Sequence, residues 1–222
     1  IPVGYYKTMH NPKTDWCYNT EPDQTMENRS IPYPRGKTLG GSSSINGLLY
    51  IRGQEQDYDI WRQLGNEGWG WDDILPYFLK SENQERGKSD FHGVGGPLSV
   101  SDQRIKLNVL DAFMNAAEEI GIPKIDDFNK GDNFGCGYFQ VTEKNGLRCS
   151  ASVGYLNPIK KNKNLKIETN CHVEKINFVN KKAASISYWK NNQLFTVKTN
   201  KEIILSAGSI GSPQILQASG IG

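Results

Sequence analysis

Residues 34–47 read PRGKTLGGSSSING, and the glycines and serines at the centre of this stretch are the strongest structural signal in the chain. Gly40 and Gly41 let the backbone pass very close to a planar or anionic ligand, because glycine has no Cβ. The three serines that follow offer hydroxyl and N–H donors at a predicted helix start, which suits an anion. A flexible Gly-Ser linker is the alternative interpretation, but the ordered apolar residues on both sides of the run disfavour it.

A second stretch, residues 208–222, reads GSIGSPQILQASGIG. The run before it, residues 202–205, is rich in β-forming residues and predicts a strand. Ser212 and Pro213 predict the N-cap and first residue of a helix that continues to about Ala218. Strand, small-residue turn and helix together form the layout that nucleotide-binding sheets use at their carboxyl edge.

Hydrophobic periodicity predicts the elements between the two stretches. Helices are expected over residues 56–64, 71–80 and 108–120, and from about residue 150 to residue 158. A stripe of apolar residues runs along the third of these helices: Val109, Leu110, Phe113, Ala116, Ala117 and Ile120. Strands are expected over residues 98–100, 165–168, 172–178, 184–189 and 194–197, the later ones forming a β-meander. The expected fold class is therefore mixed α/β.

Composition limits the function classes. The chain has 222 residues, 36% of them hydrophobic and 23% charged, which is typical of a globular protein. Its net charge of +2 comes from interspersed lysines and acids, and we expect no nucleic-acid partner. No apolar run approaches the roughly 20 residues that cross a bilayer, so no transmembrane segment is expected. The first residues also lack the pattern of a signal peptide.

The cysteines argue against a metal site. Four of them are far apart and form no CxxC pair: Cys17, Cys136, Cys149 and Cys171. Reduced, mostly buried thiols in a cytoplasmic protein are the interpretation we favour.

Both stretches resemble, position for position, the two signature segments of the glucose–methanol–choline (GMC) family of FAD-dependent oxidoreductases. The likeness continues between them at Asp15-Trp16, Thr20-Glu21-Pro22, Asp57-Tyr58-Asp59, Trp61, Gly68-Trp69, Leu75-Pro76-Tyr77-Phe78, His92-Gly93, Gly96-Pro97, Arg148, Tyr155-Leu156 and Asn164-Leu165. Among subgroups the chain looks closest to choline and aliphatic-alcohol dehydrogenases. The resemblance implies part of an FAD-binding Rossmann-like domain with a β-meander, plus part of the GMC substrate-binding domain.

By this resemblance the chain is expected to be incomplete at both ends. Residues 1–80 would form a flavin-contacting segment, residues 81–160 a portion of the substrate domain, and residues 161–222 a β-meander and a strand–helix returning to the FAD-binding domain. Missing N- and C-terminal parts of the same protein are the expected partners. The family's Gly-x-Gly-x-x-Gly turn is absent, because Gly93, Gly95 and Gly96 have the wrong spacing.

The resemblance also implies which residues bind FAD. Five should line the isoalloxazine and pyrophosphate: Gly40, Gly41, Ser42, Asn46 and Gly47. Arg35 and Lys37 should lie nearby, the backbone of Val173 should touch the adenine, and Ala207 and Gly208 should lie beside the dinucleotide. Ile45 stands where some family oxidases carry a histidine bonded to the flavin, so FAD is expected to be non-covalent.

In the complete protein we expect oxidation of an alcohol, choline-like or a primary aliphatic or aromatic alcohol, by hydride transfer to flavin N5 with a histidine as general base. The family's catalytic histidine has no counterpart here, so no catalytic residue is assigned and the segment alone should be inactive. His10, His92 and His172 are expected to be structural or solvent-exposed. Two alternatives stay open: a lyase or other non-redox flavoprotein of the same fold, and a non-catalytic fragment.

Overall fold

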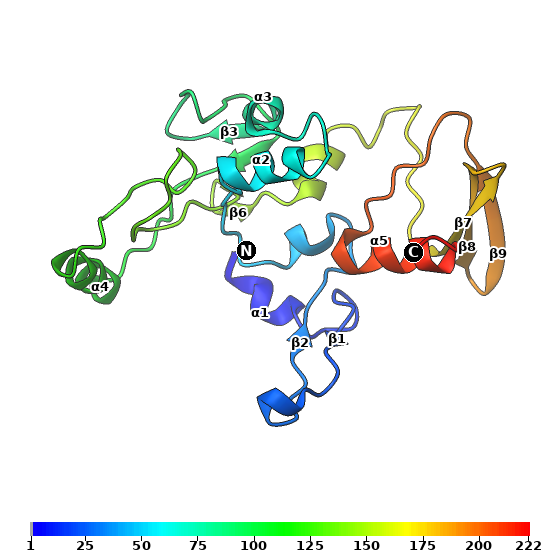
Figure 1. The fold of residues 1–222 in the computed structure, drawn as a ribbon, viewed down its shortest axis with the longest axis horizontal. Helices are drawn as coiled ribbons and strands as arrows, with labels where there is room; N and C mark the ends of the chain where they lie inside the picture. Colours follow the sequence, from blue (N-terminus) through cyan, green and yellow to red (C-terminus); the bar gives the residue numbers. More distant parts are fainter. Residues whose placement is uncertain (1) are drawn as a thin grey trace. The chain divides into compact units, whose positions relative to one another are not determined.

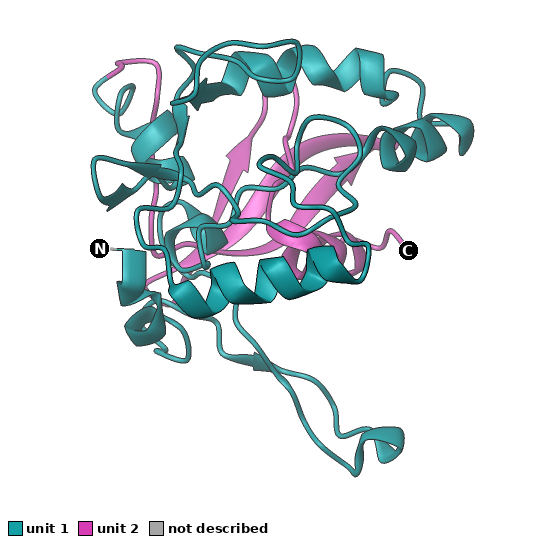
Figure 2. Ribbon diagram, turned by 90° about the vertical axis from the view of Figure 1, so that its left-hand side faces the viewer, with its two compact units in different colours: residues 1–161 teal, residues 162–222 magenta. Residues whose placement is uncertain are grey.

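The computed structural model describes residues 2–222 and divides into two compact units. Unit 1 extends to Lys161 and unit 2 comprises Asn162–Gly222 (Figure 2). Both helices and strands occur in each unit (Figure 1), so the mixed α/β class is confirmed. Along residues 2–222, no helix combines the length and the apolar character that a membrane crossing requires.

The first part of unit 1 is organised around the buried carboxylate of Asp15. The chain begins with η1 (Pro2–Gly4) and α1 (Tyr5–Thr8). The Asp15 that follows them is 1% exposed, and its carboxylate accepts hydrogen bonds from the backbone N–H groups of His10, Cys17 and Arg35 at 2.7, 3.0 and 2.9 Å. A short antiparallel pair, β1 (Tyr18–Asn19) with β2 (Pro32–Tyr33), forms an arm with η2 (Gln24–Met26) at its tip (Figure 1). Asp15 thus ties the leading segment to the chain that enters the first signature stretch.

Two helices follow the signature stretch, as predicted. α2 (Glu55–Gln63) and α3 (Trp71–Ser81) both begin with a carboxylate that accepts a backbone N–H: Asp57 from Gln54 at 2.8 Å and Asp73 from Gly70 at 3.1 Å. Aromatic rings pack between the helices, Tyr58 with Trp61, Trp71 and Phe78. Such capping and ring packing stabilise two short helices that are marginal by themselves.

A short parallel pair lies beside these helices. β3 (Glu82–Gln84) pairs with β4 (Leu98–Val100), the latter as predicted. The loop between them passes so close to α3 that a Cβ on Gly93 would lie 1.8 Å from the Leu79 carbonyl oxygen. That contact explains why glycine occupies this position.

The helix α4 (Asn108–Glu119) confirms the third predicted helix, but most of its apolar stripe is exposed. Val109, Phe113 and Ile120 are 70%, 68% and 77% exposed, whereas Ala117 is buried. Residues 2–161 therefore cover only a small part of this stripe. Unit 1 ends with a hairpin, β5 (Glu143–Lys144) and β6 (Leu147–Arg148), and with η4 (Ser152–Leu156), a π-helical turn where an α-helix was predicted.

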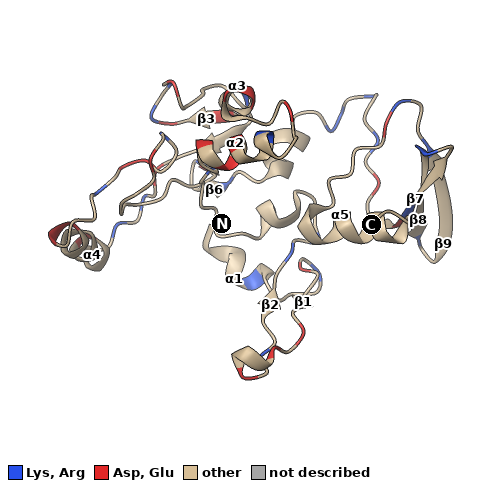
Figure 3. Ribbon diagram, viewed as in Figure 1, with Lys and Arg blue, Asp and Glu red and all other residues tan. Residues whose placement is uncertain are grey.

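Unit 2 contains the predicted meander. β7 (His172–Val179), β8 (Lys182–Lys190) and β9 (Gln193–Lys198) pair antiparallel in that order. Both turns are two residues long and have positive φ at each position, Asn180-Lys181 and Asn191-Asn192, which suits asparagine. α5 (Gly208–Ala218) carries no charged side chain (Figure 3) and is tied to β7 because Ser219 Oγ accepts the Ile176 N–H at 2.8 Å.

Two expectations for unit 2 are wrong. Residues 165–168 and 202–205 are not strands, because no hydrogen-bonded neighbour pairs with either segment within residues 2–222. The last helix starts at Gly208, whose φ is 84°, rather than at Pro213, which lies inside it. Ser212 therefore does not cap the helix; its Oγ accepts the Ala207 N–H at 3.0 Å from within the helix.

Candidate functional site

The first signature stretch folds as a tight turn held by two buried apolar residues. Ile45 and Leu48 are 3% and 5% exposed, while Asn46 and Gly47 between them are exposed. A Cβ on Gly36 would lie 2.2 Å from the Gly41 carbonyl oxygen, so the chain doubles back on itself here. We call residues 36–48 the signature turn.

The serines of the turn act differently from the prediction. The expected helix start is wrong: η3 (Gly41–Ser44) is a four-residue 3-10 turn, too short for an aligned helix dipole. Ser43 and Ser44 donate to the carbonyl oxygens of Gly40 and Leu39 at 2.5 and 2.8 Å, which stabilises the turn itself. Only the Ser42 hydroxyl, which accepts the Gly36 N–H at 3.1 Å, keeps its proton available for a ligand.

The two sides of the signature turn are unlike. A Cβ on Gly40 would lie 2.5 Å from Ser44 Oγ and 3.1 Å from Ser152 Cβ, so this side is packed. A Cβ on Gly41 or Gly47 would meet no atom within 4 Å. The backbone at Gly41 and Gly47 therefore has open space beside it, which leaves room for a ligand to approach closely.

Arg148 holds the packed side. Its Nη1 donates to Asn46 Oδ1 at 2.7 Å and to the Ser43 carbonyl at 3.1 Å, and its Nη2 donates to the Asn46 carbonyl at 2.7 Å. The Ala151 N–H adds a hydrogen bond to Ser43 Oγ at 2.9 Å. Burial lowers the pKa of the Arg148 guanidinium, which still stays protonated at neutral pH. Its only sequence signal was a place in the family pattern, without a role.

Arg35 and Lys37 lead into the turn and lie on aromatic rings. The Arg35 guanidinium is 4.0 Å from the centre of the Tyr33 ring, and Lys37 Nζ is 4.8 Å from that of Trp16. Neither cation forms an ion pair with a carboxylate among residues 2–222. Their charges therefore remain available to an anion.

The other predicted contacts belong to unit 2. Val173 lies in β7 opposite Tyr188, and Ala207 and Gly208 lie where α5 begins, both exposed. Gly208 has a φ of 84° and open space where a Cβ would be.

The three histidines lie in different surroundings. His92 is buried between two carboxylates, with Nδ1 3.0 Å from Glu82 Oε1 and Nε2 2.8 Å from Asp127 Oδ2. Its hydrogen bonds to Asp127 and Glu82 raise the pKa of His92 to about 9, so at neutral pH the ring is already protonated. Burial raises the pKa of Asp127, but the hydrogen bonds from His92 and Asn129 outweigh it and the net pKa is lowered. His10 and His172 are exposed.

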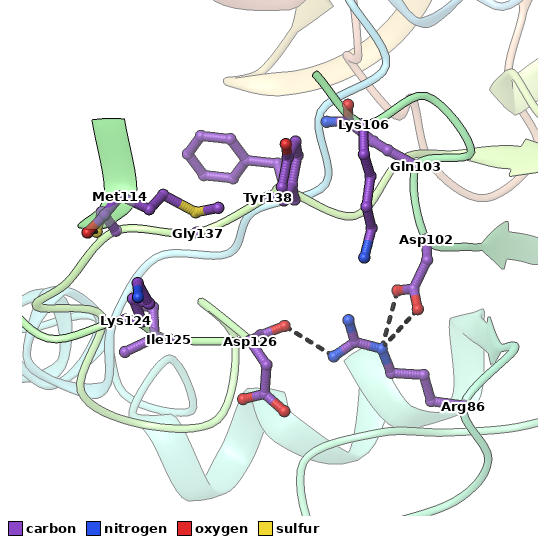
Figure 4. Close-up of a pocket in the computed structure, with 12 residues that line it drawn as sticks. Arg86, Asp102, Gln103, Lys106, Met114, Lys124, Ile125, Asp126, Gly137 and Tyr138 are labelled. Carbon is purple, nitrogen blue, oxygen red and sulfur yellow. Dashed lines mark hydrogen bonds and ion pairs between the residues drawn. The ribbon is translucent and has the colours of Figure 1, made fainter. Parts of the chain in front are cut away.

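This buried polar cluster extends further than any sequence pattern predicted. The Gln84 and Gln140 amides exchange two hydrogen bonds of 2.8 and 2.9 Å, and Gln140 donates to Asp102 at 2.8 Å. Asp102 pairs with Arg86 at the wall of a pocket of about 360 Å³ (Figure 4). No residue of the signature turn lines this pocket. Within residues 2–222, no group of three or more His, Cys, Asp or Glu side chains is placed to hold a metal ion.

The family profile described as GMC oxidoreductase matches residues 18–222. The chain belongs to the GMC oxidoreductase family. It is 41% identical to an alcohol dehydrogenase [acceptor] of Pseudomonas putida and 37% identical to mitochondrial choline dehydrogenase of Homo sapiens, matching 100% of this chain in both cases. It spans 41% and 37% of those relatives' lengths.

Solved structures of GMC-like oxidoreductases share the fold. Pyridoxine 4-oxidase from Mesorbium loti superposes with a TM-score of 0.93 at 29% identity, covering 100% of this chain and 44% of its own. An FAD-dependent oxidoreductase from Chaetomium thermophilum gives 0.88 at 30% identity, covering 97% and 41%. The cofactor of this GMC family member is FAD.

Proposed function

We propose that the full-length protein oxidises an alcohol, choline-like or primary aliphatic or aromatic, and that this chain contributes flavin contacts rather than the base. The observation that carries this is the bare side of the signature turn, where Gly41 and Gly47 leave open space. The relatives named alcohol dehydrogenase and choline dehydrogenase support the substrate class. FAD, when bound, supplies the hydride acceptor at N5.

The proposed flavin contacts are taken from the two signature stretches and from the strand that contains Val173. Gly40, Gly41, Ser42, Asn46 and Gly47 would hold the ring and pyrophosphate, with Arg35 and Lys37 nearby. Support comes from the Ser42 hydroxyl proton and from the Arg35 and Lys37 side chains, neither of which pairs with a carboxylate in the part of the chain that the structure describes. Val173, Ala207 and Gly208 are proposed to contact the adenine half, and their support is the family resemblance.

Attachment of FAD is proposed to be non-covalent. Ile45 has no nucleophilic atom, and its side chain, 3% exposed, is part of the apolar anchor of the turn. We also propose a reducing, cytoplasmic location, for which the support is that all four cysteines are free thiols.

The proton of the alcohol is proposed to go to a group outside this chain. His92 is held protonated between Glu82 and Asp127, and a protonated imidazole accepts no proton. The alcohol and choline dehydrogenase relatives are more than twice as long as this chain, so a full-length protein of that size would have further residues that could include such a group.

The test uses the purified full-length protein under anaerobic conditions. Choline, a primary aliphatic alcohol and an aromatic alcohol are mixed with it in turn while the flavin absorbance is followed. We expect bleaching with at least one of them. A protein that binds no FAD, or one that converts an alcohol without bleaching, contradicts the proposal; the second result would favour a non-redox reaction.

A further inference from the structure

The hydrogen bonds around Asn46 determine which way its amide faces. Asn46 Oδ1 accepts two hydrogen bonds, from Arg148 Nη1 at 2.7 Å and from the Leu48 N–H at 3.1 Å. A carbonyl oxygen has two lone pairs, so both are used. A flipped amide would place its NH₂ group against two donors, which excludes that orientation.

The Nδ2 group is left free by this arrangement. It carries two N–H donors and has no hydrogen-bond partner among residues 2–222, on a side chain that is exposed. Asn46 is therefore set as a hydrogen-bond donor toward whatever contacts the turn.

Arg148 makes this setting rigid. Its planar fork binds the Asn46 side chain, the Asn46 carbonyl and the Ser43 carbonyl at once, across more than 100 residues of sequence. All three acceptors are neutral oxygens, and no carboxylate pairs with Arg148 within the described chain. A lysine in this place would keep the charge but lose the simultaneous contacts.

We propose that Arg148 is a positioning residue that orients the Asn46 amide so that Nδ2 donates a hydrogen bond to an acceptor atom of the flavin. This rests on the proposed function, since it takes FAD to be the ligand of the signature turn. Arg148 acts through Asn46 and the turn.

A double-mutant cycle in the full-length protein tests the proposal. Arg148→Met, Asn46→Ala and the double variant are compared with wild type by titrating the apoproteins with FAD and by measuring the flavin reduction potential. Loss of a hydrogen bond to a charged or buried group corresponds to roughly a 5- to 100-fold weaker Kd. We expect each single variant to show a loss in this range, and the double variant to be no worse than the poorer single one.

Two further variants separate position from charge and from general damage. Arg148→Lys keeps the charge, so we expect a loss of affinity between those of wild type and Arg148→Met. Arg104→Lys alters an exposed arginine paired with Glu85, and its Kd for FAD should equal that of wild type. In the apoproteins, amide hydrogen exchange at Leu48 and Ala151 should be faster in Arg148→Met than in Arg104→Lys.

The outcomes distinguish this inference from the proposed function. If wild type binds no FAD, the proposed function and the positioning role of Arg148 are both overturned. If wild type binds FAD but the losses of Arg148→Met and Asn46→Ala simply add, or Arg148→Met binds FAD normally, the positioning role alone is overturned. Unchanged exchange at Leu48 and Ala151 would overturn it as well, whatever the cofactor does.

Discussion

Arg52 and Glu82 form an ion pair of 2.8 Å inside unit 1, with their side chains 3% and 0% exposed. Glu82 also accepts the Gly93 N–H at 3.0 Å and lies beside His92. With His92 protonated, the cations Arg52 and His92 face the carboxylates of Glu82 and Asp127, and the charges of this cluster balance. A buried charge that loses its partner is far more costly than an exposed one.

We expect Arg52→Met in the full-length protein to lower the free energy of unfolding by about 3–5 kcal/mol, because it leaves Glu82 buried without its cation. Urea denaturation followed by fluorescence measures this. Arg104→Met removes an arginine from an exposed pair, and its loss of stability should be much smaller than that of Arg52→Met. Equal losses for the two variants would mean that burial of the Arg52 pair has no energetic weight.

His92 makes stability depend on pH in a defined direction. Its pKa in the folded protein, about 9, lies above the value near 6.5 that it has when unfolded. The folded state therefore binds the proton more tightly, and its stabilisation is complete below about pH 6.5 and is lost as pH rises through about 9. The size is on the order of 1 kcal/mol for each unit of pKa difference. Unfolding free energies at pH 6 and pH 9.5 measure the loss.

His92→Gln is the control for that experiment. Other groups also titrate between these pH values, but they titrate in both proteins. The fall in stability with pH should therefore be smaller in His92→Gln than in wild type. Parallel curves would show that His92 is not held protonated by Glu82 and Asp127.

Comparing substitutions at Gly41 and Gly121 separates the effect of backbone strain from the effect of a lost ligand contact. Gly41 and Gly121 both have positive φ, 54° and 89°, and a Cβ at either would meet no atom within 4 Å. Valine at each position should therefore cost similar backbone strain. Only Gly41→Val should weaken FAD binding, with the Kd raised about tenfold for each 1.4 kcal/mol of lost contact. Isothermal titration of both full-length apoproteins checks this; equal affinities would place the ring elsewhere.

The attachment of FAD can be tested by denaturation. Because Ile45 offers no bond-forming atom, acid precipitation of the full-length protein should leave all the flavin in the supernatant. Absorbance of supernatant and redissolved pellet measures the division. Yellow colour that stays with the pellet after washing would show a covalent bond and would refute the role given to Ile45.

Sequence patterns predicted the helices and strands that are determined by residues close together in the sequence. The apolar period of α4 and the alternation of β7, β8 and β9 each lie within one short window, and both were predicted. The Asn145-Gly146 dipeptide carried a hairpin signal for β5 and β6 that was overlooked. Residues 165–168 have the composition of a strand but pair with no other strand within residues 2–222, and the sequence of a segment alone does not show whether a pairing strand exists.

The same difference between local and distant signals applies to the residues of the candidate site. Gly40 and Gly41 were predicted as site residues from their own neighbourhood, because adjacent glycines permit close approach of the backbone, and this stays a prediction. The Arg148 contacts and the Arg52–Glu82 pair were not found, because they join residues 102 and 30 positions apart. Polar side chains at such separations carry no periodic signal that marks them as partners.

The long separation between Asn46 and Arg148 also orders events during biosynthesis. The hydrogen bond joining them spans 102 residues, and ribosomes add about 5–20 residues per second. The signature turn therefore waits roughly 5–20 s after its own synthesis before Arg148 exists to hold it. The β7–β8–β9 meander closes through two-residue turns and is complete almost as soon as it emerges. The contacts that hold the signature turn therefore form later in synthesis than the turn itself, whereas the meander needs only neighbouring segments.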